Sequence, residues 1–90
     1  MIDFERMVAE QNLVDIILFL VRKENGFDYP QMDRFFSRHK FSVIENGEFM
    51  RTFEQMRLNG EVELGAKMLV MKGPKWREPK FVTEKKYGIE

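Results

Sequence analysis

The order of apolar and polar residues over the first 25 positions predicts a helix with one interruption. Asp3 is a good N-cap residue, and apolar residues follow it at helical spacing. Asn12 is also a good cap, so we expect the helix to break near Gln11 and to start again. The pair Asn25-Gly26 predicts its end, because both residues tolerate the left-handed conformation that closes many helices.

The longest apolar run of the chain, Ile16–Val21, lies in this helix. A bilayer span needs about twenty apolar residues, so no transmembrane segment is predicted. A helix that is apolar nearly all round is either buried in the core or part of a dimer contact. We favour the core alternative and keep a homodimer through the N-terminal helix as the second.

A second helix is predicted from about Pro30 to His39, because proline is accepted in the first turn of a helix and Asp28 can cap it. The residues that follow are expected to form a helical turn or a short loop. The main helix then begins at Asn46, another good cap, and ends near Leu58.

This helix carries the clearest pattern in the chain. Its large apolar residues Phe49, Phe53 and Met56 are spaced by four and then three positions, which places them on one face. Gly60 follows just beyond the helix and predicts a left-handed stop. We therefore expect one face to pack on the core and the opposite face to be exposed.

Two or three strands are predicted after this helix. Glu61–Leu64 alternates polar and apolar residues, as a half-buried strand does. Met68–Met71 is continuously apolar, Gly73–Pro79 has the composition of a turn, and Lys80–Thr83 is predicted to be a return strand. We expect residues 68–82 to form a C-terminal β-hairpin.

Three helices followed by a two-stranded hairpin resemble the winged helix-turn-helix superfamily. The resemblance rests on the spacing in the helix at 46–58 and on the hairpin at 68–82 as the wing, and it covers residues 12–83. It implies a mainly α fold, with a three-helix core plus a β-wing. The chain departs from the superfamily in one respect, since the connection from His39 to Asn46 is longer than the usual tight turn.

Composition is consistent with one domain over residues 1–90, with 43% hydrophobic and 33% charged residues. We expect a helical extension at 3–11 and a basic tail at 83–90. The net charge is zero but uneven: residues 1–66 hold eight Lys or Arg and twelve Asp or Glu, and residues 67–90 hold seven and three. Cysteine is absent from the sequence, which excludes disulfides and thiolate sites and permits a cytoplasmic location.

The sequence offers little for catalysis or metal binding. His39 is the single histidine, and Ser37 lies two positions from it on a helix, where the two side chains diverge. Glu61 and Glu63 share one face of a strand and could bind a hard cation, but a solvated strand face is the favoured interpretation. We therefore expect a protein that is not an enzyme and that has no metal site and no cofactor.

A recognition helix would present Arg51, Thr52 and Gln55 to the major groove of DNA. Arginine suits guanine there and glutamine suits adenine. The predicted wing, residues 72–80, is basic, and basic side chains anchor phosphates without reading sequence. Its candidate phosphate contacts are Lys72, Lys75, Arg77 and Lys80. Glu48 and Glu54 oppose this interpretation, because they place negative charge on the same face.

The same helix and wing could instead bind a protein. Met50 lies outside the apolar face and is either an exposed contact residue or packed back on the protein. An exposed methionine suits a protein surface better than a phosphate. Glu48 would be compatible with such a partner. Trp76 could insert into a pocket of the partner, or it could fold back over the hairpin, and we slightly favour folding back.

Two hypotheses follow from the sequence. The first is a small DNA-binding winged-helix protein, a transcriptional regulator on double-stranded DNA. The second is a protein-binding winged-helix module, such as an inhibitor, an immunity protein or an adaptor. The first ranks narrowly ahead because winged helices usually bind DNA, which is an argument from fold alone.

Overall fold

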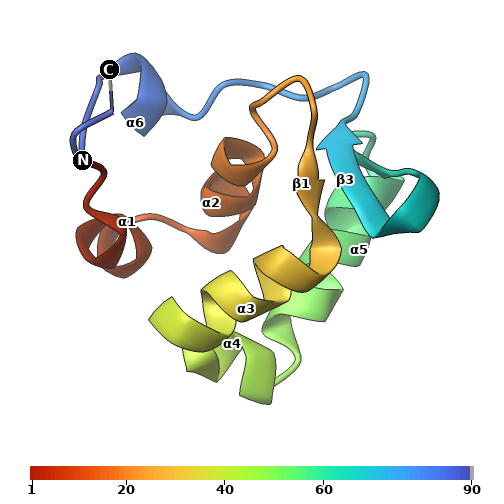
Figure 1. Ribbon diagram of the computed structural model, residues 1–90, viewed down its shortest axis with the longest axis horizontal. Helices are drawn as coiled ribbons and strands as arrows, with labels where there is room; N and C mark the ends of the chain where they lie inside the picture. The colour runs from red at the N-terminus through yellow and green to blue at the C-terminus, as the bar shows by residue number, and fades with distance from the viewer. Residues whose placement is uncertain (90) are drawn as a thin grey trace.

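The computed structural model describes residues 1–89, which are mainly helical and include a small three-stranded antiparallel sheet (Figure 1). In chain order the elements are α1 (Phe4–Glu10), α2 (Leu13–Leu20), β1 (Phe27–Asp28), α3 (Tyr29–His39), α4 (Phe41–Glu45), α5 (Glu48–Leu58), β2 (Val62–Leu64), the 3-10 turn η1 (Ala66–Met68), β3 (Leu69–Lys72) and α6 (Lys80–Thr83). The strands lie in the order β1-β3-β2, so β3 is the central strand.

The predicted break in the first helix is confirmed. The Asp3 side chain accepts a hydrogen bond from Arg6 N at 3.1 Å and caps α1, and the Asn12 side chain accepts one from Asp15 N at 2.8 Å and caps α2. The predicted end at Asn25-Gly26 is too late, because α2 ends at Leu20. Gly26 has φ +75°, and a Cβ there would lie 2.5 Å from the carbonyl oxygen of Val70, so this glycine lets β1 approach β3.

The later helices follow their caps. Asp28 caps α3, whose first turn contains the proline, and α4 is the short helical segment expected before the main helix. The Asn46 side chain accepts a hydrogen bond from Glu48 N at 2.8 Å, so α5 begins two residues after Asn46. Gly60 has φ +82°, which is the predicted left-handed stop.

The core surrounds α2. Every residue of the apolar run Ile16–Val21 is buried within the chain, so the core alternative is confirmed. This run therefore presents no surface to a second copy, and the homodimer stays a prediction that would need other residues. The predicted face of α5 is also buried, and Phe49 packs on Phe36 with ring centroids 5.0 Å apart.

The predicted hairpin at 68–82 is wrong. The hairpin pairs β2 with β3, with Val62 opposite Lys72 and Leu64 opposite Val70, and residues 80–83 form helix α6 instead of a return strand. Both edges of β3 are occupied, one by β2 and the other by β1, so a third strand has no edge to pair with. The turn of the hairpin is consequently at residues 65–68 and not at 73–79.

The last described residues pack against the start of the chain, where Asp3 N donates to the carbonyl oxygen of Tyr87 at 2.8 Å, and α6 lies on the same side of the molecule as the N-terminus (Figure 1). Tyr87 and Ile89 are buried, while Lys85 and Lys86 remain exposed. The Tyr87 hydroxyl donates to Glu10 Oε1 at 2.7 Å, and this hydrogen bond lowers the pKa of the Glu10 carboxyl. Residues 83–89 are therefore part of the packed structure and not a detached tail, and the last position of the predicted tail, residue 90, lies outside the described residues.

Candidate binding surface

The outer face of α5 carries the residues predicted to read DNA. Arg51 and Gln55 are exposed on the side away from the core, and Thr52 is half-buried. The Arg51 guanidinium donates to the backbone oxygen of Asn46 at 3.1 Å, and the Gln55 amide donates to Asn59 Oδ1 at 3.1 Å. The structure therefore places these predicted residues on one helix, where two of them already hold local partners.

A shallow hollow of about 280 Å³ lies between α5 and α2. It is lined by Val14, Arg51, Thr52, Gln55, Met56, Asn59 and Glu61. Thr52 thus points toward α2 and not away from the protein. The three predicted reading residues therefore border a shallow, mainly apolar hollow beside α2.

The remaining outer residues of α5 are mixed in character. Glu48 and Met50 are both exposed. Glu54 and Arg57 form an ion pair, with Arg57 Nε 3.1 Å from Glu54 Oε2. The hydrogen bonds from the Arg57 guanidinium lower the pKa of the Glu54 carboxyl and raise the pKa of Arg57. The charge of Glu54 is therefore balanced on the surface of the helix itself.

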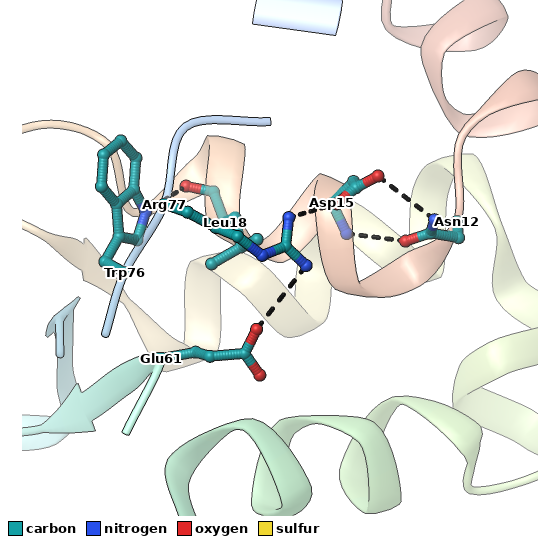
Figure 2. Close-up of polar contacts among 6 residues, drawn as sticks. All are labelled: Asn12, Asp15, Leu18, Glu61, Trp76 and Arg77. Carbon is teal, nitrogen blue, oxygen red and sulfur yellow. Dashed lines mark hydrogen bonds and ion pairs between the residues drawn. The ribbon is translucent and has the colours of Figure 1, made fainter. Parts of the chain in front are cut away.

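Trp76 folds back, as slightly favoured, but it packs on α2 and not over the predicted hairpin. Its indole N–H donates to the carbonyl oxygen of Leu18 at 2.9 Å, as Figure 2 shows. That carbonyl belongs to the last turn of α2, where a helix leaves backbone oxygens without partners inside the helix. The Lys72 ammonium lies 4.2 Å from the centroid of the indole ring. Both Lys72 and Trp76 are therefore engaged within the fold.

Arg77 connects two elements that are distant in sequence. Its Nη1 lies 3.3 Å from Asp15 Oδ1 in α2, and its Nη2 lies 3.7 Å from Glu61 Oε2 just before β2 (Figure 2). The Asp15 side chain is 20% exposed and the Glu61 side chain 17%, so the guanidinium compensates two largely covered carboxylates. Arg77 is consequently a poor candidate for a phosphate contact.

Sequence reasoning missed Asp15 and Glu61 as partners of Arg77. Asp15 is separated from Arg77 by 62 positions in the chain. Glu61 was considered for a cation, but its carboxylate faces Arg77 while Glu63 is exposed. The periodic pattern of apolar residues along the chain cannot predict an ion pair between residues so far apart in sequence.

The other predicted basic residues are not brought together. Lys75 is exposed and its backbone N–H donates to the carbonyl oxygen of Gly60 at 2.9 Å, next to the end of α5. Lys80 opens α6, which lies on the opposite side of α2 from the sheet in Figure 1. The basic residues of the predicted wing are thus divided among the ring of Trp76, the end of α5, the α2 carboxylate and α6.

The hairpin tip has an unusual backbone. Lys67 and Met68 have φ +56° and +64°, a left-handed conformation that is uncommon for residues other than glycine, asparagine and aspartate. Two successive left-handed residues are what the tightest hairpin turns require. Both side chains are exposed, so the tip presents one cationic and one apolar side chain.

Large apolar side chains are exposed on α5 and on the hairpin. Met50 is 67% exposed, Leu58 68%, Leu64 43% and Met68 47%. Between the end of α5 and the hairpin lies a shallow hollow of about 430 Å³. Its lining includes Arg57, Leu64, Met71 and Pro74. We call Met50, Leu58, Leu64, Met68 and this hollow the helix–hairpin surface.

His39 lies in an aromatic environment. His39 packs against two rings, with its centroid 4.7 Å from that of Phe35 and 5.9 Å from that of Phe4. Within residues 1–89, no group of three or more His, Cys, Asp or Glu side chains is arranged to hold a metal ion. Helices long and apolar enough to cross a bilayer are also absent from this part of the chain.

No protein-family model matches the sequence, and neither a curated protein nor a solved structure shows significant similarity to it.

Proposed function

We propose that the protein is a winged-helix module that binds a protein partner through the helix–hairpin surface. The winged-helix assignment is supported by the helices α2, α3 and α5 followed by the hairpin β2–β3. The main support for the function is the exposure of four large apolar side chains on that helix and hairpin. The centres of protein interfaces are enriched in such side chains, and methionine in particular adapts to a partner's shape.

The charges of the molecule favour a protein over DNA. Nucleic-acid affinity comes mainly from cations that are available to neutralise phosphates. Here Arg77 compensates Asp15 and Glu61, and Lys72 lies against Trp76, so two of the candidate anchors are already engaged. The outer face of α5 also carries Glu48, and a duplex would have to approach that charge.

The test compares the wild-type protein with a double variant, Met50→Glu/Leu58→Glu, in affinity purification from cells of the source organism. Both positions are exposed, so the variant should fold, and two charges at an apolar interface should abolish partner recovery. Ala9→Glu, at an exposed position on α1, is the matched control and should retain the partner. A partner that both the double variant and the wild type recover equally would refute this surface.

DNA binding is the second candidate, and the exposure of Arg51 and Gln55 on α5 together with Lys67 at the hairpin tip supports it. It predicts binding to random duplex DNA that weakens steeply between 50 and 200 mM salt, as counterion release requires. Arg51→Ala should then change sequence preference, and Lys75→Ala should weaken binding to all sequences alike. Our first proposal predicts no shift of duplex mobility at either salt concentration.

A further inference from the structure

A second surface, on α3 and away from the helix–hairpin surface, combines cations with aromatic rings. A hollow of about 510 Å³ is lined by Arg34, Phe35, Ser37, Arg38 and His39. Phe41, which begins α4, is 55% exposed and lies two positions after His39 in the chain. We call these six residues the α3 surface.

The two arginines of this surface have no electrostatic partner in the described chain. None of the ion pairs formed among residues 1–89 includes Arg34 or Arg38. They lie four positions apart on one helix, where like charges are mutually destabilising. The adjacent carboxylate of Asp33 accepts a hydrogen bond from the Ser37 hydroxyl at 3.3 Å. The two neighbouring positive charges therefore do not stabilise the protein by themselves. Their guanidinium groups are available to bind an external anion.

The walls of the hollow are apolar and rigid. The Phe35 ring packs edge-to-face on Phe36 at 5.2 Å and on Phe4 at 5.5 Å, so it cannot turn away without disturbing the core. His39 is held against the same ring. An apolar side chain of a ligand would therefore meet a surface that is already ordered, which lowers the entropic cost of binding.

The spacing of the arginines matches an extended peptide. Side chains four apart on a helix have Cβ atoms about 5–6 Å apart. Alternate side chains of an extended chain point to the same side and are about 6.6–6.8 Å apart, since each residue rises 3.3–3.4 Å. Two carboxylates separated by one residue could thus each meet one guanidinium, and arginine recognises carboxylates with good geometry.

The neighbouring charges indicate how such a peptide would lie. A second hollow, of about 440 Å³ on the other side of His39, is bordered by Asp3 and Glu5 of the N-terminal segment. These carboxylates would repel an acidic ligand, so its charged part would be directed toward Arg34 and Arg38. The next cation, Lys40, donates to the carbonyl oxygen of Val8 at 3.3 Å and is turned toward α1. Two cations beside one hollow are too few for a nucleic-acid backbone but suit a short acidic segment.

We propose that the α3 surface binds an extended acidic segment of a partner protein, with two carboxylates on Arg34 and Arg38 and an apolar side chain against Phe35 and Phe41. This inference uses other residues than the helix–hairpin surface and does not depend on it.

The probe is a fluorescein-labelled peptide with glutamate at its third and fifth positions, phenylalanine at its seventh, and glycine or serine elsewhere. Fluorescence anisotropy should show saturable binding to the wild-type protein, and Arg34→Glu/Arg38→Glu should weaken it by about tenfold or more. Phe41→Ser should weaken it less. Lys85→Glu/Lys86→Glu makes the same change in net charge at another exposed site and should leave the affinity within about twofold.

Three results would overturn the proposal. The first is no saturable binding of the peptide at low salt, and the second is an equal loss in the two charge-reversed variants. The third is tighter binding of a single-stranded oligothymidine, which would assign the surface to nucleic acid. Circular dichroism and Trp76 emission would confirm that the variants fold. If the charge reversal did not fold, Arg34→Gln/Arg38→Gln would serve in its place, with the same loss of binding expected.

Discussion

Residues 73–79 and residues 65–68 are both short connections rich in turn-forming residues, but they have opposite roles. The first contains Gly73, two prolines and Trp76, and is attached to α2 through an indole hydrogen bond and an ion pair. The second projects as the hairpin tip with exposed side chains in a left-handed backbone. Turn composition shows where a chain bends, but contacts with distant elements decide whether the bend projects into solvent.

The two connections are also expected to differ in whether they contribute to stability or to binding. The attachment of 73–79 uses side chains that a binding site would otherwise need, and it connects α2 with the start of β2. The tip of 65–68 keeps Lys67 and Met68 in a conformation that costs about 1–2 kcal/mol per residue, since neither is a glycine. We therefore expect loss of side chains in the first segment to lower the stability. Replacing Lys67 and Met68 with residues that tolerate the left-handed conformation should raise it.

The largest effect is expected for Trp76→Ala. It removes the hydrogen bond to the Leu18 carbonyl and the half-buried indole, so the free energy of unfolding should fall by about 2–4 kcal/mol. Urea denaturation followed by circular dichroism measures the change. Trp76→Phe keeps an aromatic ring and should cost only about 1 kcal/mol, mostly for the unsatisfied carbonyl. Equal stability of wild type and Trp76→Ala would mean that the segment is not attached to α2.

Arg77→Ala should have the next largest effect. It leaves the largely covered carboxylates of Asp15 and Glu61 facing each other without a cation, so the free energy of unfolding should fall by about 1–2 kcal/mol. Because the guanidinium is more than half exposed, the difference from wild type should shrink in 1 M NaCl. A loss that is independent of salt would indicate that Arg77 acts by packing rather than by charge.

Substitutions of the two left-handed residues at the hairpin tip should raise the free energy of unfolding instead of lowering it. Lys67→Asn/Met68→Gly supplies residues that tolerate the left-handed conformation, so the free energy of unfolding should rise by about 0.5–2 kcal/mol. Ala66→Gly, at a neighbouring position without positive φ, should instead destabilise the protein by about 0.5–1 kcal/mol. A destabilised tip variant would contradict the observed backbone. The same variant should bind a protein partner of the helix–hairpin surface more weakly, because it loses Met68.

The smallest effect is expected at the exposed pair of Glu54 and Arg57. The hydrogen bond from Arg57 lowers the pKa of the Glu54 carboxyl, so the pair contributes to stability at pH values above the ordinary carboxyl range. That contribution is lost as the pH falls through the lowered pKa of the folded state. In Arg57→Ala an NMR titration should show the pKa of Glu54 returning toward its usual value. No change in that pKa would mean that the ion pair is not formed in solution.

Part of the candidate site was predictable from the sequence. Glu48 and Met50 lie outside the apolar face of the helix, which allowed both to be exposed, and both are. Leu58, Leu64 and Met68 were not identified as surface residues, since an isolated apolar residue has no periodic signal that separates core from surface. Folding back of Trp76 was only slightly favoured, because both positions of the side chain satisfy the same local pattern.

The local patterns of the sequence determined helices α1, α2, α3 and α5 and the first strand of the hairpin. Caps at Asp3, Asn12 and Asp28 act within three residues, and the apolar spacing of α5 with its glycine stop acts within one helix. Such short-range effects can be recognised in a single sequence. The strand of Val62–Leu64 was found for the same reason.

Only the tertiary structure decided that residues 80–83 form α6 and that residues 73–79 lie on α2. The first depends on β3, whose two edges are already occupied by β1 and β2. The second depends on contacts that join positions 58 and 62 residues apart in the chain, from Trp76 to Leu18 and from Arg77 to Asp15. Competition for a strand edge and pairing across such separations involve the whole fold, so no window of local sequence contains them.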